Sequence, residues 1–378
     1  MNGRRILIDG SMARSGGGAT YVRNLVPRLA ALRPEDRFRL WLREEHLAAA
    51  LPPLANLEVE VLPEVAWTGR MRFLVLHAAE RARRWGADLY FSTAEYAPPR
   101  PPCPAIASFR NPNVFSRLDL GWPLRQRARL FVLRRLASHS ARVCARILFV
   151  SADSAGWIGD EVGLPPERRA VVPHGIDLEA WSRASVAPQR LAGGRPYLLS
   201  VSSVYRYKNY VRLIEAWSQV ARRRPDAPDL VIIGDEPDRA HRRDMEAARA
   251  ATGALAQRTH LLGEVPYAEI RGWYAGACGF VFPSFLETFG HPLIEAMAME
   301  LPIVAAEIGV FREIAADCVL GADPHDTGAL AAAMESLLAD PSLARDLAAR
   351  GRRRAGGFSW DRSARLHADL LSDVLAAP

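Results

Sequence analysis

Two glutamates, Glu287 and Glu295, have the residue type and spacing that most readily suggest chemistry in this chain. They lie within FLETFGHPLIEAMAME, residues 285–300, which follows the apolar run Gly279–Phe282. A short apolar run that ends abruptly indicates a buried strand. Pro292 suits the first turn of a helix, because its ring fixes φ and its missing N–H would be unpaired there anyway. The spacing therefore predicts a strand, a loop and a helix, with carboxylates at both ends of the loop.

The backbone amides near Gly290 and His291 fall at the start of this predicted helix. Free amides and the helix dipole favour an anion at such a position. Two carboxylates beside an anion are repulsive, unless the ligand also carries hydroxyl groups that the acids can bind. A nucleotide sugar offers both phosphate and hydroxyls, so the segment favours a nucleotide-sugar site.

Lys208 is the only lysine among 49 basic residues. It follows the predicted strand Tyr197–Val201 and precedes a helix that begins near Val211. Loops at the carboxyl edge of a parallel sheet commonly bind phosphate, and an ammonium group acts there as a compact point charge. We therefore expect Lys208 to contact phosphate; a solvated loop lysine is the alternative interpretation.

The segment matches the pattern F-x-E-T-F-G-x-P-x-x-E-A-M-A and resembles the E-x7-E signature of the retaining GT-B glycosyltransferases of the GT4-like family. The resemblance covers essentially the whole chain. It implies that Glu287 contacts hydroxyls of the donor sugar and that Glu295 holds the ribose diol. It also implies that the amides around Phe289 and Gly290 face the donor. The alternative is a helix-capping Glu287 and a solvated Glu295.

The resemblance further implies the activity. We expect retaining, metal-independent transfer of a hexose-type sugar from a nucleotide diphosphate sugar to a glycan or lipid-linked acceptor, without a cofactor, in polysaccharide or glycolipid assembly. Lys208 and Arg206 would stabilise the charge that develops on the leaving diphosphate. His291 is expected near the sugar and Val265 near the base. Glu287 as a covalent nucleophile is a less attractive alternative.

Two positions depart from the common family pattern. Where members carry an arginine shortly before the phosphate-binding lysine, this chain has Ser203. Either Arg206 replaces that arginine, or Ser202 and Ser203 bind phosphate as neutral donors. Where many members place a cleft histidine after a strand of the first domain, this chain has Asn111. Its amide is expected to bond a sugar hydroxyl, and a role in stabilising a turn is equally supported.

A glycine-rich loop follows the first predicted strand, Arg5–Asp9. Gly16, Gly17 and Gly18 would let the backbone approach a ligand closely at the start of a helix from about Ala19. The loop lacks the G-x-G-x-x-G pattern, which disfavours a nicotinamide dehydrogenase. We expect it to contact the donor phosphates or the acceptor; a plain flexible turn is the alternative.

The fold that must position these residues is an α/β fold. Apolar strands alternate with amphipathic helices along 378 residues, which is too long for one ordinary core. The resemblance implies a GT-B architecture, two Rossmann-like doubly wound domains facing across a cleft. We predict an acceptor-side domain at 1–185, rejoined by a helix at about 360–378, and a nucleotide-sugar domain at 186–359. Residues 182–196 are expected to form a linker. The strands of the second domain are predicted at Tyr197–Val201, Leu230–Gly234, His260–Leu262, Gly279–Phe282 and Ile303–Ala305.

Positive charge is concentrated in Arg110–Arg146, which holds nine arginines and one acid among leucines and aromatic residues. A basic helix with apolar neighbours can lie on an anionic membrane, whereas a solvated helix face is the equally supported alternative. Motifs for nucleic-acid binding are missing. No apolar run reaches the roughly 18 residues of a membrane helix, and the four cysteines form no C-x-x-C pair. We therefore expect a cytoplasmic enzyme, peripheral on the inner face of the membrane. A GT-B-fold sugar-nucleotide epimerase and a non-catalytic nucleotide-binding scaffold are the competing functions.

Overall fold

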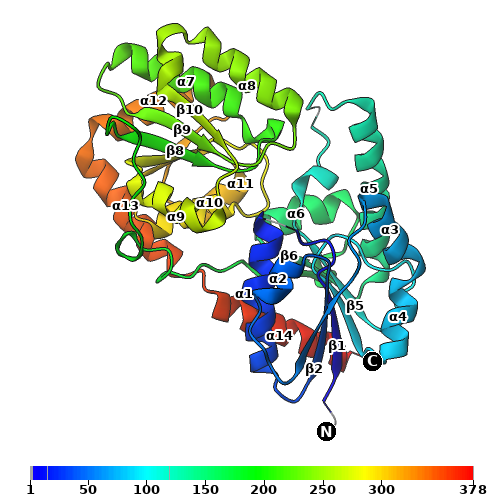
Figure 1. Cartoon of the computed structure of the whole chain (residues 1–378). Helices are drawn as coiled ribbons and strands as arrows, with labels where there is room; N and C mark the ends of the chain where they lie inside the picture. The colour runs from blue at the N-terminus through cyan, green and yellow to red at the C-terminus, as the bar shows by residue number, and fades with distance from the viewer. Residues whose placement is uncertain (1–2, 15, 119, 378) are drawn as a thin grey trace. The chain divides into compact units, whose positions relative to one another are not determined.

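The computed structural model describes residues 3–14, 16–118 and 120–377. The chain forms two compact units. Unit 1 consists of Met1–Gly175 and Ser359–Pro378, and unit 2 of Ile176–Phe358. Each unit is an α/β layer structure built on one parallel sheet (Figure 1). In the described part of the chain, no helix has both the length and the apolar character needed to cross a membrane.

Unit 1 contains a seven-stranded sheet of order β3-β2-β1-β4-β5-β6-β7, in which every paired strand is parallel. Its central strands are buried on both faces, which is why they appear in the sequence as nearly continuous apolar runs. The strands are β1 (Arg5–Asp9), β2 (Arg37–Leu42), β3 (Leu57–Val61), β4 (Leu89–Ser92), β5 (Ala105–Phe109), β6 (Arg146–Phe149) and β7 (Arg169–Val171).

Helices cover both faces of this sheet. They are α1 (Gly16–Leu32), α2 (Glu45–Ala49), α3 (Trp67–Leu76), α4 (Ala78–Trp85), α5 (Leu124–Val143), α6 (Ala152–Glu161) and α14 (Trp360–Ala376). Figure 1 shows α1 and α14 side by side on one face and α3, α4 and α5 on the other. A 2.6 Å hydrogen bond between the Tyr21 hydroxyl and His367 Nε2 joins α1 to α14 inside the core. The late helix α14 is therefore part of unit 1.

Unit 2 contains a six-stranded parallel sheet of order β10-β9-β8-β11-β12-β13. The strands are β8 (Tyr197–Val201), β9 (Asp229–Ile233), β10 (Thr259–Gly263), β11 (Gly279–Phe282), β12 (Ile303–Ala306) and β13 (Leu320–Ala322). The predicted strands of this unit agree with the observed ones except at their ends, and β13 was not predicted. Its helices are α7 (Tyr210–Arg223), α8 (Arg239–Ala251), α9 (Tyr267–Gly276), α10 (His291–Ala298), α11 (Gly309–Ala315), α12 (Thr327–Ala339) and α13 (Pro341–Ala355). In Figure 1, α7 and α8 lie on one face of the sheet and α9 and α10 on the other.

The segment expected to be a linker, 182–196, is instead packed onto α9 as part of unit 2. The Arg183 guanidinium donates to the carbonyl oxygens of Ala275 at 3.1 Å and Ala277 at 2.7 Å. The Gln189 amide donates to the carbonyl of Gly272 at 2.9 Å. These bonds hold the segment along the helix, so the boundary between the units lies at Gly175 rather than at residue 185. Polar composition alone did not distinguish a docked segment from a free one.

The strand order reverses direction beside β8 in unit 2. From β8 the chain builds outward through β9 and β10, then returns to place β11 on the other side of β8. In open parallel sheets, ligands bind outside the carboxyl ends of the strands at such a switch point. The loops that follow β8 and β11 are therefore the place to look for a ligand site in this unit.

Candidate functional site

Lys208 and Glu287, which the sequence analysis treated separately, form one ion pair at this switch point. Lys208 ends a short 3-10 turn (Arg206–Lys208) after β8, and Glu287 lies in the loop after β11. The Lys208 ammonium is bonded to Glu287 Oε1, and the two side chains are only 9% and 10% exposed. Lys208 Nζ also lies 5.0 Å from the ring centroid of Tyr207 and 5.6 Å from that of Phe282. The cation is thus enclosed by one carboxylate and two aromatic rings.

Backbone contacts hold the two loops together. The Phe285 amide donates to the Tyr207 carbonyl at 3.1 Å, beside the ion pair. Asn209 has a left-handed backbone, with φ of +64°, and its buried side-chain amide donates to the carbonyls of Pro283 at 3.2 Å and Pro324 at 2.6 Å. Asparagine tolerates this conformation better than most residues. The loops after β8, β11 and β13 are consequently connected through one side chain.

The start of α10 is shaped by Gly290, the residue immediately before the helix. Its φ is +85°, a region that favours glycine. A Cβ atom at this position would lie 2.8 Å from Phe311 Cε1, which would force that ring to shift, and 3.2 Å from Phe282 Cε1, which is a tight contact. Phe289 is buried and packs edge-on against His291, with ring centroids 5.5 Å apart. Conformation and space both require glycine here, and the helix N-terminus follows directly after the Glu287 loop, as predicted.

Glu295 lies one helical turn farther along α10. The hydroxyl of Tyr274, a fully buried residue of α9, donates to Glu295 Oε2 at 3.0 Å. Burial raises the pKa of Glu295 to about 7, and the hydrogen bond from Tyr274 opposes that rise. The carboxyl group is therefore close to half ionised near neutral pH. The structure does not support the alternative of a solvated Glu295.

The other predicted residues of unit 2 lie in the loops after β8 and β10. Arg206 points to α8, where its Nε lies 3.4 Å from Asp238 and its Nη2 lies 3.7 Å from Asp244. Ser202 and Ser203 are half-buried in the loop after β8. Val265 is half-buried in the loop after β10. The Gly234 amide donates to the Gly263 carbonyl at 2.9 Å, and this bond joins the end of β10 to the end of β9. In the described residues, no three His, Cys, Asp or Glu side chains are grouped so that they could hold a metal ion.

The predicted residues of unit 1 lie at the ends of its strands. Gly17 and Gly18 are inside the first turn of α1, because the helix begins at Gly16 rather than near Ala19. Asn111 is exposed, and its side-chain oxygen accepts a hydrogen bond from the Asn113 amide at 3.1 Å. This caps the 3-10 turn Pro112–Val114, which agrees with the turn-stabilising alternative for Asn111. Its assignment as a sugar contact stays a prediction.

A buried polar cluster beside Asn111 was not predicted. Glu95 is 7% exposed and accepts hydrogen bonds from the amides of Arg110 at 3.0 Å and Asn111 at 2.8 Å. The Arg110 guanidinium lies 4.2 Å from the ring centroid of Tyr21 and also donates to the Thr93 carbonyl. Burial raises the pKa of Glu95 and lowers that of Arg110. The sequence signal that could have indicated this cluster is Glu95, an acid three residues after the end of β4. β4 pairs with β1, the strand at which the strand order of this sheet reverses.

Two family models match consecutive parts of the chain. "Glycosyltransferase Family 4" matches residues 15–180, and "Glycosyl transferases group 1" matches residues 183–354. A D-inositol 3-phosphate glycosyltransferase of Frankia alni is 30% identical over 230 residues, covering 58% of this chain and 56% of the relative. An alpha-maltose-1-phosphate synthase of Mycolicibacterium smegmatis is 33% identical over 237 residues, covering 56% and 59%. The chain thus aligns with about half the length of these curated relatives.

Solved structures agree in fold. Sucrose-phosphate synthase from Thermosynechococcus elongatus superposes with a TM-score of 0.77 at 20% identity, covering 99% of this chain and 100% of that one. Anabaena HepE in complex with UDP-glucose gives a TM-score of 0.76 at 16% identity, covering 98% and 99%. The parallel sheets, the sequence motif and the two successive family models lead to one assignment. The chain belongs to the GT4-like (glycosyl transferases group 1) family and has the GT-B fold.

Proposed function

We propose that this protein is a retaining glycosyltransferase that uses a nucleotide diphosphate sugar as its donor. The observation that carries the proposal is the buried Lys208–Glu287 ion pair at the switch point of unit 2. Desolvating two charges is costly, so a buried pair is weak evidence for stability and is more readily explained by a role in binding. The pair lies beside a helix N-terminus that presents backbone amides to an anion.

The ion pair supports a simple exchange on donor binding. In the free protein, Lys208 and Glu287 neutralise each other. A donor would give Lys208 a phosphate oxygen in place of the carboxylate, and would give Glu287 sugar hydroxyls in place of the ammonium. Each buried charge would then remain compensated, and the cation would lie where the leaving diphosphate gains negative charge. No protein base is needed if the leaving phosphate takes the acceptor proton, and we propose that the reaction proceeds in this way without a metal.

Glu295 is suited to accept hydrogen bonds from the two ribose hydroxyls of the donor. A carboxylate accepts hydrogen bonds from two adjacent hydroxyls, whereas a neutral carboxyl group offers fewer acceptor sites. Because the pKa of Glu295 is about 7, the ionised form is fully populated only above neutral pH. Donor binding would favour ionisation, so we expect donor affinity to increase as the pH rises from 6 to 8.

We further propose that the acceptor is lipid-linked or another anionic glycan presented at a membrane surface, which α5 contacts. The first half of α5 is largely exposed, including Leu124 at 81% and Phe131 at 59%. Arginines 125, 127 and 129 lie between these apolar residues, and α5 contains no acid. Apolar side chains with interleaved arginines match an anionic lipid surface. The buried side chains of α5 begin only at Leu133, and Ala137 and Ala141 follow it into the core.

The membrane contact is tested by flotation with vesicles of phosphatidylcholine alone and with phosphatidylglycerol added. We expect binding to the anionic vesicles only, and a large loss of binding in Leu124→Ser/Phe131→Ser. A matched control is Val61→Ser, since Val61 is also exposed but lies on β3. Equal flotation of the double variant and the wild type would contradict this part of the proposal.

The donor site is tested by thermal-shift measurements of the purified chain with UDP-, GDP-, ADP- and TDP-sugars in EDTA. A ligand that binds only the native state raises its stability by mass action. We expect stabilisation by one nucleotide family, lost in Lys208→Ala and kept in Lys208→Arg only at reduced affinity. NMR of the product formed by an active donor–acceptor pair then shows whether the anomeric configuration is retained. Nucleotide binding with no transfer or epimerisation would favour a scaffold, and release of an epimerised sugar nucleotide would favour an epimerase.

A further inference from the structure

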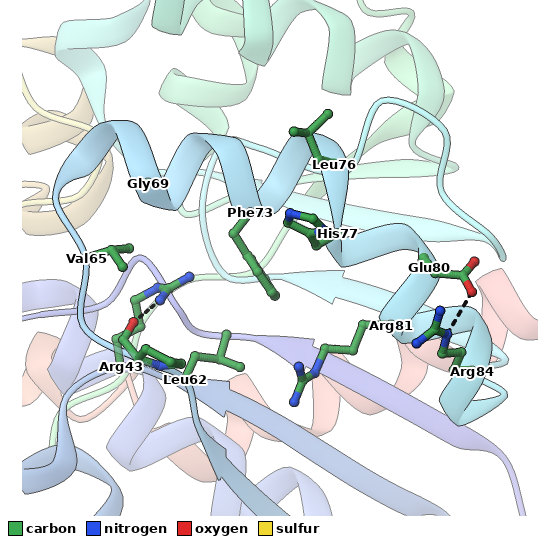
Figure 2. Close-up of a pocket in the computed structure, with 11 residues that line it drawn as sticks. Arg43, Leu62, Val65, Gly69, Phe73, Leu76, His77, Glu80, Arg81 and Arg84 are labelled. Atoms are coloured by element: carbon green, nitrogen blue, oxygen red, sulfur yellow. Dashed lines mark hydrogen bonds and ion pairs between the residues drawn. The ribbon is translucent and has the colours of Figure 1, made fainter.

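A pocket of about 470 Å³ opens in unit 1 beside the carboxyl ends of β2 and β3, under α3 and α4 (Figure 2). This volume lies within the range of small-molecule sites. The apolar part of the lining includes Leu62, Val65, Phe73 and Leu76. The polar lining is mostly basic, with Arg43, His77, Arg81 and Arg84 against one acid, Glu80.

Arg43 is the unusual member of this lining. It follows β2, is only 5% exposed, and its guanidinium lies 5.1 Å from the ring centroid of Phe73. It donates to the Pro63 carbonyl, but its buried Nε has no hydrogen-bond partner. Among the residues that the structure describes, no carboxylate lies within ion-pair distance of Arg43. Figure 2 shows its side chain and Phe73 on facing sides of the same space.

The neighbouring acids are already bonded to other groups. Glu64 accepts two hydrogen bonds from Arg70, at 2.6 and 2.8 Å, and Asp9 accepts from Tyr90 and from the Ser11 amide. Burial and the charge of Arg70 lower the pKa of Arg43, and the charges of Asp9 and Glu64 oppose this only in part. A buried cation without a paired anion is unfavourable, and a ligand anion would remove that penalty.

The arginines at the other end of the pocket differ from Arg43 in this respect. Arg81 is bonded to Glu60, and Arg84 is bonded to Glu80 at 2.8 Å. Both arginines are ion-paired within the protein, so each should attract a ligand anion less than Arg43 does. The anion should therefore be held at the Arg43 end, with the apolar part of the ligand directed along Phe73 toward Leu76.

We propose that this pocket binds a small amphiphilic anion, a phosphate monoester or a carboxylate with a short apolar group, whose acidic group pairs with Arg43. Arginine suits both acids, because its planar fork bonds two oxygens at once. The inference concerns unit 1 alone and goes beyond the donor site. Ligand binding in this pocket does not depend on the Lys208–Glu287 site in unit 2.

Isothermal titration of the full chain tests it, with hexyl phosphate, heptanoate, methyl phosphate and hexanol as probes. We expect the two hexyl-chain anions to bind and hexanol not to bind. Loss of a charged hydrogen bond in Arg43→Gln should weaken binding about tenfold or more, whereas Arg43→Lys keeps the charge and should lose less. Arg72→Gln is the matched control, because Arg72 is an exposed arginine of α3 that does not line the pocket. The control variant should bind hexyl phosphate and heptanoate with the same affinity as the wild type.

A second variant keeps the test valid if Arg43→Gln fails to fold. Leu76 is 59% exposed, so Leu76→Ser should fold normally. It should reduce the preference for hexyl phosphate over methyl phosphate. The proposal is overturned if neither anion binds the wild type, if Arg43→Gln binds as tightly as the wild type, or if Leu76→Ser leaves that preference unchanged. Lys208→Ala should bind the probes normally, which separates this result from failure of the donor site.

Discussion

Glu295→Gln should make the free protein more stable at pH 8 while weakening donor binding. The pKa of Glu295 rises from 4.5 to about 7 because the carboxylate is buried. At about 1.4 kcal/mol for each pKa unit, holding this group ionised costs about 3 kcal/mol of the free energy of unfolding. Glutamine removes the charge and still accepts the hydrogen bond from Tyr274. Since the amide must also leave water, we expect a net gain of about 2 kcal/mol.

The pH dependence gives the sign of this effect. The folded pKa is raised, so the native state binds the proton more tightly than the unfolded chain does. The wild type therefore loses stability as the pH rises from about 4.5 to about 7, and the loss is complete above that range. Glu295→Gln cannot titrate and should not show this loss. The wild type and Glu295→Gln should have similar free energies of unfolding at pH 4.5, and the difference between them should grow toward pH 8.

Urea unfolding from pH 4.5 to 8.5 measures the difference, with hydrogen exchange in α10 reporting on unit 2 separately from unit 1. Glu215→Gln is a suitable control, because Glu215 is exposed on α7 of the same unit. Its effect should stay within about 0.5 kcal/mol. Parallel pH curves for the wild type and Glu295→Gln would refute the reasoning, and so would donor binding by Glu295→Gln that equals the wild type at pH 8.

Three further predictions concern the same sheet edges. Lys208→Met or Glu287→Gln alone should lower the free energy of unfolding by about 3 kcal/mol, because each leaves a buried charge unpaired. In urea unfolding, the double variant should lose much less than the sum of the two single losses. It should not transfer sugar. Gly290→Ala should lower the free energy of unfolding by about 2 kcal/mol or more, because a φ of +85° is strained for alanine and the new Cβ would press on the Phe311 ring. A loss below about 0.5 kcal/mol would contradict this. Asn111→Asp keeps the oxygen that caps Pro112–Val114 but removes the amide donor, so it should fold normally, and a normal transfer rate would eliminate the amide as a sugar contact.

The local structure around the donor site could be predicted because it depends on neighbouring residues. The strand Gly279–Phe282 is a bounded apolar run, and the helix after it starts beside Pro292, as its fixed φ requires. The start of α1 was placed too late, because three glycines weaken the helical pattern although the helix includes them. β13 is only three residues long and contains Gly321, so it has no periodicity to recognise.

Contacts between distant residues could not be predicted in this way. Lys208 and Glu287 are 79 positions apart, and only the order of the strands brings them together. The proximity of Arg206 to Asp238 and Asp244 likewise depends on where α8 lies. That no carboxylate of the described residues lies within ion-pair distance of Arg43 is likewise known only from the packing of its neighbours. Charge type and spacing identified candidate residues, whereas their partners depended on the packing of the sheet.

The position of α14 in unit 1 has a consequence for synthesis on the ribosome. All of unit 2 is translated before α14, although most of unit 1 is translated first. Until Trp360 and His367 emerge, Tyr21 and the apolar face of α1 lack the helix that buries them. Unit 1 therefore cannot complete its core until α14 has been made, although most of its residues are translated before unit 2 and N-terminal domains usually fold first. A released chain that ends at residue 358 should contain a protease-resistant unit 2 and a protease-sensitive unit 1.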